Sequence, residues 1–128
     1  MVFNIGNIIY NTLVEATEGK LPVYPLINTD ENSKLPFIVY RRMGYSPEYS
    51  KGLYSLIDTY DYSIAIVSDK YNEGVEVADK VINAIMALTG KEIDGKFIQS
   101  SEVTEATETV GDDILFIQDL DFQIKITK

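Results

Sequence analysis

Apolar residues recur at helical spacing in two segments of the chain. The first spans Asn4–Thr17 and is followed by Gly19, a residue common just past a helix end. The second spans Ser68–Gly90, where the side chain of Ser68 or Asp69 can cap the first turn. The apolar positions are Ile5, Ile8, Ile9, Leu13 and Ala16 in the first segment, and Val75, Ala78, Val81, Ile82, Ile85 and Leu88 in the second. The pattern predicts two amphipathic helices.

Four other segments have the alternation or the composition of β-strands: residues 37–43, 56–68, 96–105 and 116–126. The residues expected to share one face are Phe37, Val39 and Met43 in the first, Tyr60, Tyr62, Ile64 and Ile66 in the second, and Phe116, Leu120, Phe122, Ile124 and Ile126 in the last. The remaining strand, residues 96–105, has the weakest pattern. Two long neighbouring strands and a final strand are therefore expected.

The connections follow from proline, glycine and polar residues. Pro22 and Pro25 confine the residues between them to a short edge strand or an extended connector. Residues 44–52 contain Pro47 and polar residues, which predicts a long exposed connection. Asp94 and Gly95 form a dipeptide typical of a type I′ turn, which would join residues 92–93 to 97–98.

The expected order is helix, short strand, two long strands, helix and two more strands. Consecutive strands joined by hairpins favour a mainly antiparallel sheet, with the helices packed against it. We therefore predict an α+β fold, a two-layer sandwich with a sheet of four to five strands and two helices on one face. The length of 128 residues fits a single domain over residues 1–128.

Composition narrows the range of functions. The chain has no cysteine and no histidine, which removes thiolate chemistry, the usual zinc sites and serine–histidine catalysis. No glycine-rich phosphate-binding motif is present. A net charge of −9 disfavours specific nucleic-acid binding, and no apolar run approaches the ~20 residues of a membrane span. We expect a soluble protein that is not an enzyme and has no cofactor or metal.

Tyrosines concentrate in the region from residue 40 to residue 62. Six of the nine tyrosines lie there, several of them in the polar connection, where no core requires them. Tyrosine is enriched in protein interfaces, although it also favours strands in general. The residues that we expect at a subunit interface are Arg41, Tyr45, Tyr49, Tyr54 and Tyr60. The alternative for Arg41 and Arg42 is an ordinary surface position.

Acidic residues dominate the segment from Ser101 to Asp121, which contains no lysine or arginine. Such a segment can line a channel and repel passing DNA. The acidic channel or rim candidates are Glu102, Glu105, Glu108, Asp112 and Asp113. A solvated hairpin is the simpler alternative, and a divalent cation on Asp112 and Asp113 is a third, although no calcium-loop spacing supports it.

Several short strings, taken in order, resemble the tail completion (tail terminator) family of long-tailed bacteriophages and prophages. They are Val23-Tyr24-Pro25, the string from Leu35 to Tyr40, an extended hairpin connection, a strand that runs directly into the 68–90 helix, and a final alternating strand. The resemblance covers nearly the whole chain. The many tyrosines and the acidic segment depart from common family members.

The resemblance implies a structural virion protein without an active site. It implies a homo-oligomeric ring, commonly of six subunits, that caps the tail tube and joins it to the head. The partners would be the tail tube protein and the head connector protein, with DNA passing through the ring. The protein would be made in the bacterial cytoplasm and located at the head–tail joint of the virion. The alternatives are a monomeric adaptor or assembly chaperone, and a carboxylate-dependent enzyme.

Overall fold

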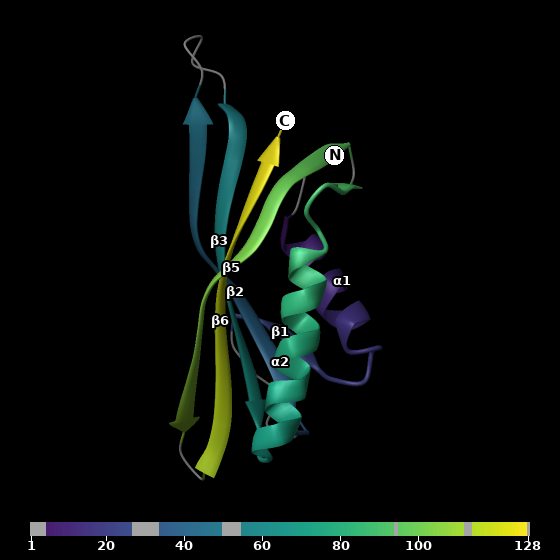
Figure 1. Cartoon of the computed structure of the whole chain (residues 1–128), viewed down its shortest axis with the longest axis vertical. Coiled ribbons are helices and arrows are strands. Elements are labelled where there is room, and N and C mark those ends of the chain that lie inside the picture. Colours follow the sequence, from purple (N-terminus) through teal and green to yellow (C-terminus); the bar gives the residue numbers. More distant parts are fainter. Residues whose placement is uncertain (1–4, 27–33, 50–54, 94, 112–113, 128) are drawn as a thin grey trace.

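The computed structural model describes residues 5–26, 34–49, 55–93, 95–111 and 114–127, without the side chains of residues 48, 49, 55 and 56. Within these residues, two helices and six strands follow one another (Figure 1). They are α1 (Ile5–Ala16), β1 (Val23–Pro25), β2 (Phe37–Tyr49), β3 (Ser55–Ser68), α2 (Tyr71–Met86), β4 (Glu92–Ile93), β5 (Lys96–Gly111) and β6 (Leu115–Thr127).

The strands form one sheet in the order β1-β2-β3-β6-β5-β4. The short β1 runs parallel to β2, and every other neighbouring pair is antiparallel. The α+β class is confirmed, but the sheet has six strands where four to five were expected. The additional strand is the two-residue β4, which pairs with the start of β5 across the predicted turn. Gly95 lies in this turn with a φ of +78°, which glycine adopts without steric cost.

A single cluster of buried apolar side chains joins the helices to one face of the sheet. From α1 it receives Ile5, Ile8, Ile9 and Leu13, and from α2 Ala78, Val81 and Ile85. The central strand β6 contributes Leu120, Phe122, Ile124 and Ile126, as its alternation predicted. The helical stripes predicted from the sequence are thus largely confirmed, with Ala16, Val75 and Ile82 only half-buried.

Both helices lie on the same side of a strongly twisted sheet (Figure 1). At one end of the sheet the β2–β3 hairpin extends beyond the helices. At the opposite end the β5–β6 hairpin meets the start of α2, where Tyr71 packs on Phe116. The expected two-layer sandwich therefore describes the molecule except at the β2–β3 end, where no described helix covers the sheet.

One prediction about β2 was wrong. The expected loop at residues 44–52 is strand as far as Tyr49, paired with β3 through two irregularities in register, after Arg42 and after Glu48. Phe37 and Val39 share a face, as expected, since they pair with Val67 and Ala65. The buried residue near the start of the strand is Ile38, on the other face, which has no exposed surface. The first four residues of β2 are all apolar, so alternation could not identify which face enters the core.

The start of α2 also differs from expectation. The helix begins at Tyr71 and ends at Met86, and its N-cap position, Lys70, has no side-chain cap. Ser68 instead shapes the connection, since its hydroxyl accepts a hydrogen bond from the Lys70 N–H at 3.1 Å and donates one to the Lys70 carbonyl at 2.9 Å. Ser68 therefore holds the turn between β3 and α2 without capping the helix.

Candidate assembly surface

The sheet has two faces with different chemistry, and register assigns each residue to one of them. Paired residues on neighbouring strands share a face. We call the side of the buried Phe122 the helix-covered face, and the side of Asp119 and Asp121 the open face. Along β6 the open face carries Ile117, Asp119, Asp121, Gln123, Lys125 and Thr127, all half-buried.

The two predicted interface arginines point to opposite faces. Arg41 pairs with Ser63, which pairs with Asp121, so Arg41 lies on the open face. Arg42 pairs with Tyr62, which packs in the core, so Arg42 lies on the helix-covered side. Both side chains are exposed, and neither forms an ion pair with a carboxylate in the described part of the chain.

Tyr45 and Tyr60 lie together on the helix-covered side of the sheet. Their ring centroids are 5.1 Å apart, and the Tyr45 hydroxyl donates a hydrogen bond of 2.9 Å to Asp58 Oδ1. Asp58 is only 6% exposed, so this contact helps to satisfy a buried carboxylate. Partial burial raises the pKa of Tyr60, the negative Asp58 adds to the rise, and Arg42 opposes it.

The five predicted interface residues are therefore not one cluster. Tyr45 and Tyr60 share the helix-covered side, while Arg41 lies on the open face. Tyr54 and the side chain of Tyr49 lie outside the described residues. The sequence predicted an exposed loop here, but the chain is a paired strand as far as Tyr49. Tyr45 nevertheless remains 45% exposed.

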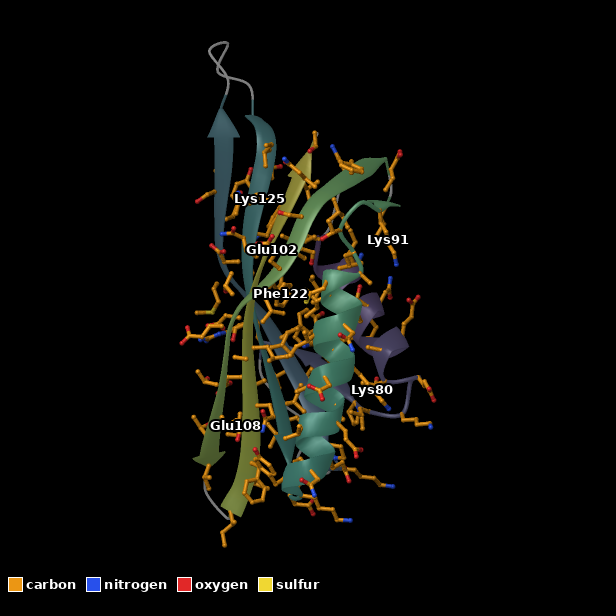
Figure 2. All side chains as sticks on the ribbon, in the orientation of Figure 1. Lys80, Lys91, Glu102, Glu108, Phe122 and Lys125 are labelled. Carbon is orange, nitrogen blue, oxygen red and sulfur yellow. The ribbon has the colours of Figure 1, made fainter. Side chains whose placement is uncertain are left out.

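The acidic candidates are also divided between the faces. Glu102 and Glu105 pair with Gln123 and Asp121, which places them on the open face. Glu108 pairs with Gln118 and lies on the other side, near the lower end of β5 in Figure 2. There Glu108 accepts a hydrogen bond of 3.0 Å from the exposed Tyr71 hydroxyl, which raises the pKa of that tyrosine.

Asp112 and Asp113, the remaining acidic candidates, lie outside the described residues. No group of three or more aspartate or glutamate side chains within the described ranges is arranged to hold a metal ion. Likewise, none of the helices in those ranges is long and apolar enough to cross a membrane.

Asp119 is a half-buried carboxyl on the open face whose pKa is raised. Burial raises its pKa, the neighbouring Asp121 charge raises it further, and a hydrogen bond from the Thr109 hydroxyl opposes both. It lines a shallow pocket of about 220 Å³ with Arg41, whereas Asp121 lines a different one beside Met43. The two carboxyls are thus neighbours on a strand without sharing one pocket, which gives little support to a paired-carboxylate active site.

A pocket of about 230 Å³ lies where the start of α2 meets the β5–β6 hairpin. Tyr71 and Phe116 form one wall, with ring centroids 5.7 Å apart. Gln118 also lines it; this residue is 7% exposed, and its side-chain nitrogen has no hydrogen-bond partner. Val110 and Ile114, which are 67% and 73% exposed, lie at the end of the same hairpin. Sequence reasoning missed this apolar end, because its residues meet only through strand pairing.

No protein family profile and no curated protein matches the chain. Solved structures do. One chain of the virion of a native gene transfer agent particle aligns with a TM-score of 0.72 at 12% identity, covering 94% of this chain and 92% of that one. A second solved protein aligns with a TM-score of 0.59 at 13% identity, covering 96% of both chains.

These likenesses show that the fold is shared over nearly the whole length with both proteins, the first of which is a chain of a gene transfer agent virion. The likenesses agree with the α+β fold expected from the sequence, whereas the virion role and the particular family stay predictions. At identities of 12% and 13%, the comparison supports a shared arrangement of helices and strands, but it assigns no role to any individual residue.

Proposed function

We propose that this chain is a non-enzymatic structural component of a phage-like virion, where it forms a homo-oligomeric ring that closes the tail tube and joins it to the head. The observation that carries the proposal is the fold shared over 94% of the chain with a gene transfer agent virion chain. A six-subunit ring, contacts with a tail tube protein and a head connector, and passage of DNA through the ring belong to this proposal.

The shape of the molecule supports assembly by binding. The β2–β3 and β5–β6 hairpins lie toward opposite ends of the sheet (Figure 1), one clear of the helices and the other beside the start of α2, so each subunit offers two unlike surfaces. A closed ring requires such head-to-tail contacts between different patches. The acidic open face, with Glu102, Glu105 and Asp121, suits a channel surface along which DNA passes without adhering.

The test is deletion of the gene from the genome that encodes it, with electron microscopy of the resulting particles. We expect DNA-filled heads and separate tails, with tails of irregular length, and normal particles when the wild-type gene is restored. Purified protein added to tail tubes should form caps at the tube ends. Normally joined particles in the deletion strain would rule out the joining role, and a monomer bound along an unrelated component would favour the adaptor alternative.

A further inference from the structure

The outer side of β5 is a free sheet edge over most of its length. β4 pairs only with Lys96 and Phe97. The chain after α2 then covers Ile98, which exchanges backbone hydrogen bonds of 2.8 Å with Gly90 and Lys91, and the Thr89 hydroxyl accepts the Ser101 N–H. From residue 102 to residue 111, β6 is the one described strand that pairs with β5. We call this outer side of residues 102–111 the β5 edge.

The composition of the β5 edge suits pairing with a basic strand. Free edges are commonly protected by lysine or proline, and this segment contains neither. Its charged residues are Glu102, Glu105 and Glu108, all negative and all exposed. Two such edges would repel each other, because like charges would stand opposite one another across the pair. The edge therefore rejects its own copy and favours a strand of opposite charge.

The chain itself provides that strand. β1 ends opposite Tyr40, so Arg41, Arg42 and Met43 continue along β2 with β3 as their one sheet neighbour among the described strands. Both arginines are exposed, as is Met43, with 56% of its surface accessible. β2 lies toward the opposite side of the sheet from β5, so one subunit can use both surfaces at once.

The charges also match face by face. Arg41 lies on the open face, as Glu102 and Glu105 do, and Arg42 lies on the helix-covered side, as Glu108 does. If a sheet continues from one subunit into the next, residues on corresponding faces become neighbours. Each arginine then has a glutamate available on its own side, where guanidinium–carboxylate hydrogen bonds are strong.

We propose that the β5 edge binds strand β2 of a second copy of this chain, beginning at Arg41, so that one sheet continues from subunit to subunit. This proposal rests on the ring of the proposed function and specifies the contact that builds it. It is a head-to-tail contact by strand addition, in which backbone hydrogen bonds supply affinity and the arginine–glutamate pairs supply orientation.

The experiment is a charge-reversal rescue, with association measured by sedimentation and by decoration of tail tubes. The basic-strand variant carries Arg41→Glu and Arg42→Glu, and the acidic-edge variant carries Glu102→Arg, Glu105→Arg and Glu108→Arg. Each alone should associate at least about 10-fold more weakly than wild type, since like charges then meet. An equimolar mixture should associate again, because the acidic β2 of one variant meets the basic β5 edge of the other.

Matched controls reverse as many exposed charges away from the contact. Lys80→Glu with Lys91→Glu, two lysines that lie on the helix side in Figure 2, matches the first variant. Glu15→Arg, Glu76→Arg and Asp79→Arg, on the helices, match the second. Both controls should associate as wild type does. Urea unfolding of every variant verifies that the fold is intact, and glutamine versions of each set replace any variant that does not fold.

Three outcomes overturn the proposal. The first two are variants that associate as well as wild type and a mixture that does not recover. A wild-type protein that stays monomeric at high concentration and with tail tubes also overturns it. Failure of the contact is distinguishable from failure of the proposed function. If both charge-reversed variants still cap tube ends and join heads to tails, the ring stands and its subunits meet elsewhere.

Discussion

The two faces of strand β6 differ sharply in burial and in polarity. On the helix-covered face, Phe122 and Ile124 are at most 1% exposed and pack within the core (Figure 2). On the open face, Asp121 and Gln123 alternate with them and remain half-buried under neighbouring side chains only. Successive residues of one strand thus face a buried apolar core and a polar surface in alternation.

This difference indicates that one face stabilises the fold and that the other is available for contacts with other molecules. Burial of apolar area on one side stabilises the domain, at roughly 25 cal/mol per Å². The open face contributes little of that energy, so its charges are free to serve contacts with other molecules. Changes on the helix-covered face should therefore alter stability strongly, and changes on the open face should alter it weakly.

The largest effect should come from Phe122→Ala. Phe122 is 1% exposed and stacks on Tyr62 with ring centroids 5.7 Å apart, so truncation removes buried area and leaves a cavity. We expect a loss of about 3–5 kcal/mol in the free energy of unfolding, measured by urea denaturation. Lys125→Ala, on the opposite face of the same strand, is the control and should change little. Equal losses would abolish the distinction between the faces.

A smaller loss should follow Tyr45→Phe, which tests a polar site on the helix-covered side. The change removes the hydroxyl that donates to the buried Asp58 and keeps the ring beside Tyr60. Loss of a hydrogen bond to a buried charged group predicts a destabilisation of about 1–3 kcal/mol. Tyr10→Phe, an exposed tyrosine on α1, provides the comparison. An unchanged urea midpoint for Tyr45→Phe would show that the remaining contacts satisfy Asp58.

Gly74→Ala should stabilise the domain. Gly74 is buried within α2, and an added Cβ would meet Ser68 Cβ at 3.5 Å and Gln118 Cγ at 3.7 Å, which is ordinary contact. Alanine removes the conformational penalty of glycine in a helix, a gain of about 0.5–1 kcal/mol. Gly19→Ala, at a φ of +71°, should instead destabilise. A lower thermal midpoint for Gly74→Ala would mean that this packing is tighter than the distances indicate.

The smallest effect should be a pH dependence on the open face. The folded protein raises the Asp119 pKa above its ordinary value of 3.8, so the native state holds this proton more tightly than the unfolded chain does. The wild type therefore loses stability as pH rises through and above 3.8. We expect Asp119→Asn to be more stable than wild type at neutral pH, with the difference vanishing below pH 3.8. In paired urea titrations, the stability of Asp119→Asn should also depend less steeply on pH than that of the wild type.

Regular alternation made much of the fold predictable. The helical stripe of α2 and the apolar positions of β6 follow a clear period, and both enter the core as expected. The order of the long elements was also correct. The extension of β2 was missed because Gly44 and Pro47 are typical of loops, whereas here they lie in a strand with an irregular register that tolerates them.

The candidate surface was harder to predict because it depends on pairing between distant segments. Nothing local shows that Tyr45 reaches Asp58, thirteen residues away, or that Tyr71 reaches Glu108. The acidic residues were identified from composition, but their division between two faces follows from register and from the irregularities after Ile98 and Val103. Whether these residues act in assembly stays a prediction until the association experiments are done.

The position of β6 has a consequence for how the domain can form. It lies between β3 and β5, yet it follows both of them in the chain, so no hairpin joins β3 to β5 directly. Until β6 inserts, the other strands exist as two separate ribbons with exposed inner edges and an incomplete core. A fragment that stops before Leu115 should thus lack a native state and aggregate. In the whole chain, the folding rate should be governed by this late, long-range insertion.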